Sequence, residues 1–278
     1  MGNKSNFYDE SKLTERQKRE IEYYGTYVNL QNIENVSFDP IDGRERRPWN
    51  SYWYVYELSK KFYNNERNKL LDFGCGCGES SVLFAKIGYD VHGFDISQDS
   101  IDVAKKLSKK YGFENKIDFS LQVSENLDFK SNSFDIIVGV DILHHVELKS
   151  AINECKRVLK KGGIAIFREP VEVPFLDYIR NTRLIKYFVP NEKNYTPGVH
   201  ITQDERKLCD KDISILSDSF KEIQEERFTL LARFDRYFRK YYKGRPSPLE
   251  IIDYLIFKYI SFSKKFGGDA VFILKNPK

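Results

Sequence analysis

Short apolar runs alternate with amphipathic segments through the middle of the chain. Five runs have the composition of buried parallel strands, being mostly apolar and bounded by glycine or polar residues. They span residues 69–73, 89–94, 117–121, 134–140 and 164–167. The segments 79–86, 99–111 and 149–159 lie between strands and read as helices. The alternation predicts an α/β fold, a parallel sheet with right-handed crossovers and helices on both faces.

The pattern is less regular on either side of this core. Residues 1–65 look helical and polar and end in the aromatic run WNSYWYVYELSKKF, so they are expected to form an N-terminal helical cover. Strands are also expected at Phe220–Phe234 and Asp269–Leu274. Residues 66–278 would then form the main domain. Its two insertions, at about 170–205 and 235–266, are expected to form the pocket for a substrate, because long loops of this kind are often functional.

The amino-acid composition excludes few classes of protein. Of 278 residues, 41% are hydrophobic and 15% aromatic, which is enough to bury a core, and a net charge of +4 compels neither nucleic acid nor a membrane as partner. No run approaches the length of a membrane span and the N-terminus is too polar for a signal peptide, so a cytoplasmic location is expected. Four isolated or closely spaced cysteines show no disulfide framework.

The stretch LLDFGCGCGES carries the first chemical signal. Gly74, Gly76 and Gly78 stand between a strand and a helix, where missing Cβ atoms let a ligand approach the backbone and the helix N–H groups. A dinucleotide site is one alternative, but the spacing is G-x-G-x-G rather than G-x-G-x-x-G, and Asp72 would repel a phosphate. A cationic ligand with an amino group removes that objection, and Asp95 is placed to accept from the hydroxyls of a ribose.

Two other interpretations of this turn are possible. It could be a plain strand-to-helix turn, or Cys75 and Cys77 could be a metal or redox pair. Zinc needs about four ligands, and no second Cys/His pair has ligand spacing. No metal is therefore expected, and the cysteines are interpreted as small turn residues.

Four segments in order, LLDFGCGCG, FDIS, ENLDFKSNSFDIIVGVDILHHV and RVLKKGGIAIF, resemble class I S-adenosylmethionine (SAM)-dependent methyltransferases that act on small molecules. The resemblance covers about residues 69–169. It implies a Rossmann-like, mostly parallel seven-stranded sheet whose last strand, here Asp269–Leu274, is antiparallel. It also implies SAM as cofactor, with S-adenosylhomocysteine as product.

The resemblance assigns cofactor contacts position by position. The methionine end of SAM would lie against Asp72 and the turn, the ribose against Asp95, and the adenine against Ile96 and Ser124 or Glu125. Val123 stands where the family usually has an aspartate. Val140 and Asp141 would line the methyl side. The cofactor-binding residues expected are Asp72, Gly74, Cys75, Gly76, Gly78, Asp95, Ile96, Ser124, Glu125, Val140 and Asp141.

Candidates for catalysis and acceptor binding follow the strand ends. His144, His145 and Glu169 are candidate catalytic groups, against the alternatives of structural histidines and an internal Arg168–Glu169 ion pair. Trp49, Tyr52, Trp53 and Tyr56 have helical spacing, so they are expected to share one face that forms either a pocket wall or core. The candidate substrate residues are Trp49, Tyr52, Trp53, Arg168 and, in the first insertion, His200.

The segment RFDRYFRKYYKGR and the apolar stretch after it leave three alternatives open. Residues 235–266 could make peripheral membrane contact, cover an anionic small molecule, or form a buried helix with a solvated basic face. Nucleic acid is not expected. The function expected is methyl transfer from SAM to an oxygen of a small or lipid-linked metabolite. N-methyl transfer, a non-catalytic SAM-binding subunit and, opposed by the glycine spacing, an NAD-dependent oxidoreductase are the alternatives, and no oligomeric state is predicted.

Overall fold

The computed structural model describes residues 10–29, 36, 38, 47–174, 178, 206–235 and 246–278. Its longer helices are α1 (Glu15–Asn29), α2 (Ser51–Phe62), α3 (Glu79–Ile87), α4 (Gln98–Lys110), α5 (Leu148–Val158), α8 (Asp210–Ser219) and α10 (Pro248–Tyr259). Its strands are β1 (Lys69–Phe73), β2 (Asp90–Asp95), β3 (Ile117–Leu121), β4 (Phe134–Val140), β5 (Leu159–Pro170), β6 (Phe220–Phe228) and β7 (Asp269–Pro277). Short 3-10 turns are η1 (Glu10–Lys12), η3 (Leu143–His145), η5 (Ala232–Phe234) and η6 (Ser261–Phe266).

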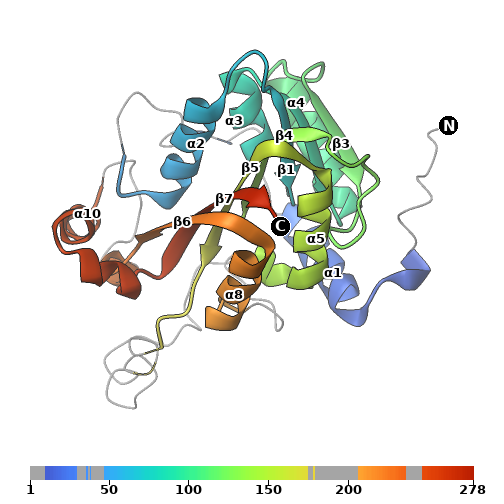
Figure 1. Ribbon diagram of the computed structural model, residues 1–278. Coiled ribbons are helices and arrows are strands. Elements are labelled where there is room, and N and C mark those ends of the chain that lie inside the picture. The colour runs from blue at the N-terminus through green and yellow to red at the C-terminus, as the bar shows by residue number, and fades with distance from the viewer. Residues whose placement is uncertain are drawn as a thin grey trace.

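The strands form one sheet in the order β3-β2-β1-β4-β5-β7-β6 (Figure 1). The first five strands in the chain pair in parallel, and β7 runs antiparallel to both of its neighbours, β5 and β6. The predicted seven-stranded sheet with an antiparallel last strand is therefore confirmed. Strand order reverses at β1 and β4, so the carboxyl ends of these strands border the crevice where ligands bind in open α/β sheets.

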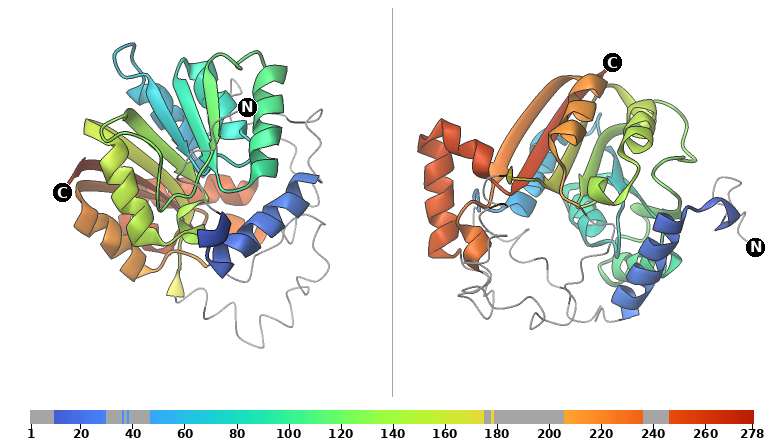
Figure 2. Two further views of the ribbon diagram at one scale, coloured as in Figure 1. Left: turned by 90° about the vertical axis from the view of Figure 1, so that its right-hand side faces the viewer. Right: turned by 90° about the horizontal axis from the view of Figure 1, so that it is seen from below.

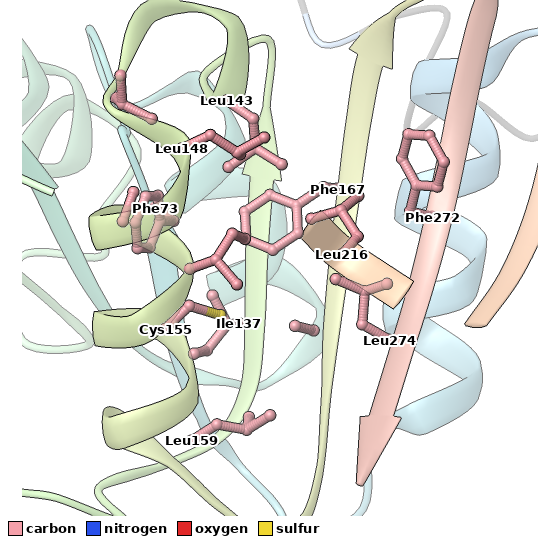
Figure 3. Close-up of a cluster of buried hydrophobic side chains, with 14 of the residues drawn as sticks. Phe73, Ile137, Leu143, Leu148, Cys155, Leu159, Phe167, Leu216, Phe272 and Leu274 are labelled. Atoms are coloured by element: carbon pink, nitrogen blue, oxygen red, sulfur yellow. The ribbon is translucent and has the colours of Figure 1, made fainter. Parts of the chain in front are cut away.

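Alternating residues of each strand enter two separate cores, because successive side chains in a strand point to opposite faces. Leu70, Ile136 and Ile166 pack with α2 and α3 on one face. Leu71, Ile137 and Phe167 pack with α5 and α8 on the other, where Figure 3 shows Phe167 between Leu148 and Phe272. Burial on both faces explains why the strands read as continuous apolar runs.

The last third of the chain differs in detail from the prediction. The strand expected over 220–234 ends at Phe228, because Thr229 takes a positive φ of 63° and the chain then makes the turn η5. Three backbone N–H groups after that point, those of Leu230, Leu231 and Ala232, donate to the carboxylate of Asp253 in α10 at 2.7–2.9 Å. β5 begins at Leu159, earlier than expected.

Two predicted insertions are only partly within the described residues. Most of 170–205, including His200, and residues 236–245 of the basic segment lie outside them. None of the helices in the described ranges combines the length and apolarity needed to cross a bilayer.

Candidate functional site

The glycine turn after β1 opens onto a cavity of about 380 Å³ at the carboxyl ends of β1, β2 and β4. Of the residues predicted to bind cofactor or substrate or to act in catalysis, eleven line it: Tyr52, Gly74, Cys75, Gly76, Asp95, Ile96, Ser124, Glu125, Val140, Asp141 and His145. The structure therefore brings together most of the predicted cofactor-binding residues, although they come from four separate segments of the chain.

The glycines of the turn have different reasons to be glycine. A Cβ on Gly76 would meet no protein atom within 4 Å, so this position faces open cavity, and its φ of 50° is one that side chains rarely adopt. A Cβ on Gly78 would instead lie 2.8 Å from the Cβ of Ala104 in α4. Gly78 does not line the cavity; it lets α3 pack against α4.

Asp95 joins the turn to the end of β2. Its Oδ2 accepts from the N–H of Gly76 at 3.0 Å and its Oδ1 from the N–H of Ser97 at 2.9 Å. Burial raises the pKa of this carboxyl, while those N–H groups favour the charged form. Each oxygen keeps a lone pair that can accept from a hydroxyl in the cavity.

Asp72 lies behind the cavity wall rather than on it. Its side chain is buried and its Oδ2 accepts from the hydroxyls of Ser80 and Ser81 at 3.0 and 2.5 Å. Burial raises the pKa of Asp72 to about 6 despite these hydrogen bonds. Ser80 lines the cavity and Asp72 does not, so the prediction that Asp72 contacts a ligand directly is wrong.

Burial also makes both cysteines of the turn weak acids. It raises the pKa of Cys75 well above the ordinary thiol value and that of Cys77 to about 12. A nucleophilic or metal-binding cysteine needs its thiolate form. Across the described ranges no three His, Cys, Asp or Glu side chains are grouped to hold a metal ion.

Helices α1 and α2 cover the cavity. From α1, Arg16 donates to the carbonyls of His144 and Val146 at 3.0 and 3.2 Å, and Gln17 donates to Oε2 of Glu125 at 3.2 Å. Residues of this cover and of the wall that the sequence did not single out include Gln17, Glu20, Tyr24, Ser80, Ser100 and Gln122. For Gln17, Glu20 and Tyr24 the only signal in the sequence was the helical pattern of the N-terminal segment, whereas Ser80 closely follows the glycine turn.

The adjacent histidines His144 and His145 have different environments. His145 lines the cavity, with Nδ1 3.2 Å from Oε2 of Glu20 in α1. His144 is buried, with Nδ1 2.6 Å from Oε2 of Glu169, and the other oxygen of Glu169 accepts from the N–H groups of Ile142 and Leu143. Neither His144 nor Glu169 reaches the cavity, which corrects their prediction as catalytic groups: they hold the turn η3 against β5.

Tyr52 and Asp141 line the cavity on the side of β5, and Arg168, predicted to contact substrate, does not line it but contacts both residues. The hydroxyl of Tyr52 donates to Oδ2 of Asp141 at 2.8 Å, and Arg168 pairs with Asp141 and, at 2.7 Å, with Asp269. The guanidinium also lies 4.4 Å from the centre of the Tyr52 ring. Asp141 has a positive φ of 55°, a strained conformation of the kind found at functional sites.

A second hollow of about 460 Å³ lies between α2, the end of β6 and α10. Trp49 and Trp53 line it, and a small hollow lined by Trp49, Tyr52 and Arg168 shares Trp49 with the second hollow and Tyr52 with the first cavity. The indole Nε1 of Trp49 is buried without a hydrogen-bond partner in the described part of the chain.

The predicted shared face of the four aromatic residues is wrong. Helix α2 begins only at Ser51, so Trp49 precedes it. Tyr52 and Tyr56 line the first cavity, whereas Trp53 lines the second hollow.

Comparison with known proteins relates the middle of the chain to one family. Residues 71–167 match the family described as "Methyltransferase domain". The Saccharomyces cerevisiae protein named "Probable S-adenosylmethionine-dependent methyltransferase CRG1" is 24% identical over 205 residues, covering 72% of this chain and 67% of that protein. A ubiquinone biosynthesis O-methyltransferase of Pelagibacter ubique is 40% identical over 97 residues, which are 34% of this chain and 39% of that protein.

A solved structure shares the fold over most of the chain. It is a geranyl diphosphate C-methyltransferase from Streptomyces coelicolor, whose structure holds S-adenosyl-L-homocysteine, and its TM-score is 0.56 at 14% identity, covering 94% of this chain and 97% of that one. At this identity the likeness shows a common fold and leaves the acceptor of this chain open.

Proposed function

We propose that this chain, in which residues 71–167 are a class I SAM-dependent methyltransferase domain, transfers a methyl group from SAM to an oxygen of a small or lipid-linked metabolite. The observation that carries the proposal is the pairing of Gly76 with Asp95 at the first cavity. The open backbone position of Gly76 and the half-buried carboxylate of Asp95 are joined there by a hydrogen bond.

The residues of the cavity fit SAM. Asp95 can accept from ribose hydroxyls, and the cavity side of Gly76 leaves room for the methionine end beside Ser80. The hydroxyl of Ser100 also lines the cavity and has no hydrogen-bond partner among the described residues. Asp72, one layer behind Ser80, supplies negative charge on the side where the amino group would lie.

Bound SAM supplies an electrophilic methyl carbon on its sulfonium. The task of the chain is then to align the acceptor, exclude water and take up the acceptor's proton. His145 is the proposed proton acceptor, because it lines the cavity and a carboxylate, that of Glu20, lies 3.2 Å from its Nδ1. Helices α1 and α2 cover the cavity and exclude water.

The acceptor is proposed to reach the first cavity from the second hollow, past Tyr52 and Arg168. Trp49 and Trp53 offer apolar rings for an aromatic or isoprenoid group, and the free Nε1–H of Trp49 can donate to an acceptor oxygen. Oxygen as the methylated atom is supported by the name of the Pelagibacter relative, which acts in ubiquinone biosynthesis.

Calorimetric titration with SAM tests the cofactor assignment. Asp95→Ala should weaken binding by about 1.5–3 kcal/mol, as loss of charge-assisted hydrogen bonds does. Asp90→Ala removes a carboxylate from the other end of the same strand, where it pairs with Lys116, and should bind SAM like the wild type. Equal affinities for the two variants would contradict the assignment.

Turnover on a panel of phenols, with and without isoprenoid tails, tests the reaction. His145→Gln should lower kcat by about 10²-fold or more if it accepts the proton. The same variant should keep SAM affinity close to that of the wild type. A panel on which the wild-type protein methylates amines but no hydroxyl would overturn the choice of oxygen.

A further inference from the structure

Helix α10 is apolar on the face turned away from the molecule. Six large apolar side chains between positions 251 and 262 are exposed to solvent: Ile251, Ile252, Leu255, Tyr259, Ile260 and Phe262. We call them the outer face of α10 and η6. Tyr259 and Phe262 are the most exposed, at 72% and 69%. Only three other large apolar residues in the described part of the chain are exposed, Tyr52, Tyr178 and Phe234, so the exposure is concentrated here.

The inner face of the same helix explains why α10 is held in this orientation. Asp253 accepts three backbone N–H groups from the segment after β6, and Phe257 is buried beside it. Ser247 and Glu250 cap the first turn reciprocally. The outer face therefore cannot turn inward without breaking these contacts, and contiguous exposed apolar surface of this kind marks an interaction site.

The charges around the outer face are cationic. Lys258 and Lys265 are exposed, and the Nζ of Lys258 lies 5.2 Å from the centre of the Tyr259 ring. The two carboxylates of the segment 248–266 are engaged elsewhere, Asp253 in the buried network and Glu250 in the helix cap. Apolar and aromatic side chains flanked by lysines are typical of helices that lie in the interface of an anionic membrane.

The position of α10 leaves the face accessible. The helix lies beside β6, at the end of the molecule opposite α1 (Figure 2, right). The helix lines the second hollow through Tyr254 and Phe257, and the exposed Lys258 also borders that hollow. A surface that bound the outer face would therefore lie one helix away from that hollow.

We propose that the outer face of α10 and η6 docks on the surface of an anionic lipid bilayer, with Tyr259 and Phe262 inserted between head groups and Lys258 and Lys265 facing lipid phosphates. Tyr259 suits this depth because its ring is apolar and its hydroxyl is polar, and Phe262 adds purely apolar contact. The docking goes beyond the proposed methyl transfer and does not depend on it.

Vesicle flotation with the full chain tests the proposal. Wild-type protein should float with vesicles of phosphatidylcholine and phosphatidylglycerol, and much less with phosphatidylcholine alone. The triple variant Leu255→Ser, Tyr259→Ser, Phe262→Ser should lose binding by about tenfold or more, because the removed side chains supply the apolar contact. All three positions are exposed, so the melting temperature and SAM affinity should change little.

A charge-reversed pair gives a second test. Lys258→Glu with Lys265→Glu should also release the protein from anionic vesicles, whereas Lys105→Glu with Lys106→Glu on exposed positions of α4 changes the net charge equally and should not. Wild-type protein that stays at the bottom of the gradient would overturn the proposal. So would equal flotation of the wild-type protein and the triple variant. A dimer in light scattering that the triple variant converts to monomer, without flotation of the wild type, would assign the face to a second copy and overturn the lipid proposal.

Discussion

The hydroxyl of Tyr52 in α2 donates a hydrogen bond of 2.8 Å to Oδ2 of Asp141, the residue that follows β4. The two residues are 89 positions apart in the chain, and both line the first cavity. The bond therefore connects the N-terminal cover to the end of the sheet where the cofactor is proposed to bind.

Tyr52→Phe, compared with a control variant, tests whether the hydrogen bond from Tyr52 to Asp141 contributes to SAM binding as well as to the stability of the fold. Without the hydroxyl, Asp141 keeps Arg168 as partner but loses the contact that orients it toward α2. We expect a loss of stability of about 1 kcal/mol and a decrease in SAM affinity of about fivefold. Tyr111→Phe removes a comparable hydrogen bond, to the carbonyl of Val36 at 2.9 Å. It should cost similar stability and leave calorimetric SAM affinity unchanged; a parallel effect of both variants on binding would refute this role.

Asp72 should make the stability of the protein depend on pH. Its pKa in the folded state is about 6, above the ordinary 3.8, so the folded state holds the proton more tightly than the unfolded chain. The free energy of unfolding therefore falls as pH rises from about 4 to 6. Asp72→Asn removes the charge and should be more stable than the wild type at pH 8, by as much as about 3 kcal/mol.

Urea unfolding at about pH 5 and pH 8 measures this difference. The advantage of Asp72→Asn should be larger at pH 8 by about 1 kcal/mol. The control Asp218→Asn changes an exposed carboxyl on α8 and should show no such trend. The Asp72→Asn variant should also bind SAM more weakly, because the negative charge behind Ser80 is lost. Unchanged SAM affinity would mean that the charge of Asp72 does not stabilise the bound cofactor.

Large side chains at Gly76 and Gly78 should have opposite consequences. Gly76→Leu places its side chain in open cavity, so SAM binding should be lost while unfolding free energy falls only by the strain of a positive φ, about 1 kcal/mol. Gly78→Leu forces α3 away from Ala104 in α4 and should destabilise the fold by about 3 kcal/mol or more. Circular dichroism on melting, together with SAM titration, distinguishes the two. A Gly76→Leu protein that binds SAM normally would contradict the proposed cradle.

Glu169→Gln should destabilise the protein, because Glu169 has a structural role and is not a catalytic group. Glu169 is fully buried and accepts from Ile142, Leu143 and His144, and an amide nitrogen in place of either oxygen cannot accept. We expect about 2–4 kcal/mol of destabilisation, measured by urea unfolding. Glu172→Gln, on an exposed neighbouring position, is the control and should be neutral. A Glu169→Gln protein with wild-type stability but no turnover would restore Glu169 as a catalytic candidate.

Much of the fold was readable from local patterns. Apolar runs such as 134–140 identified strands that are buried on both faces, and the glycines after Phe73 identified the turn, because both depend on neighbours close in sequence. Asp95 could be placed for a similar reason: it ends a strand adjacent to β1, and parallel strands bring their carboxyl ends to one edge.

Side-chain direction at the site depended on long-range packing. Whether His144 or His145 faces the cavity follows from how the turn η3 sits against β5 and α1, and the partners involved, Glu169 and Glu20, are distant in sequence. The rotation of α2 against the sheet directs Tyr52 to the first cavity and Trp53 to the second hollow, and the position of β1 within the fold leaves Asp72 behind Ser80. Periodicity specifies which residues can share a face, but the rotation of a helix and the depth of a strand come from contacts between segments far apart in the chain.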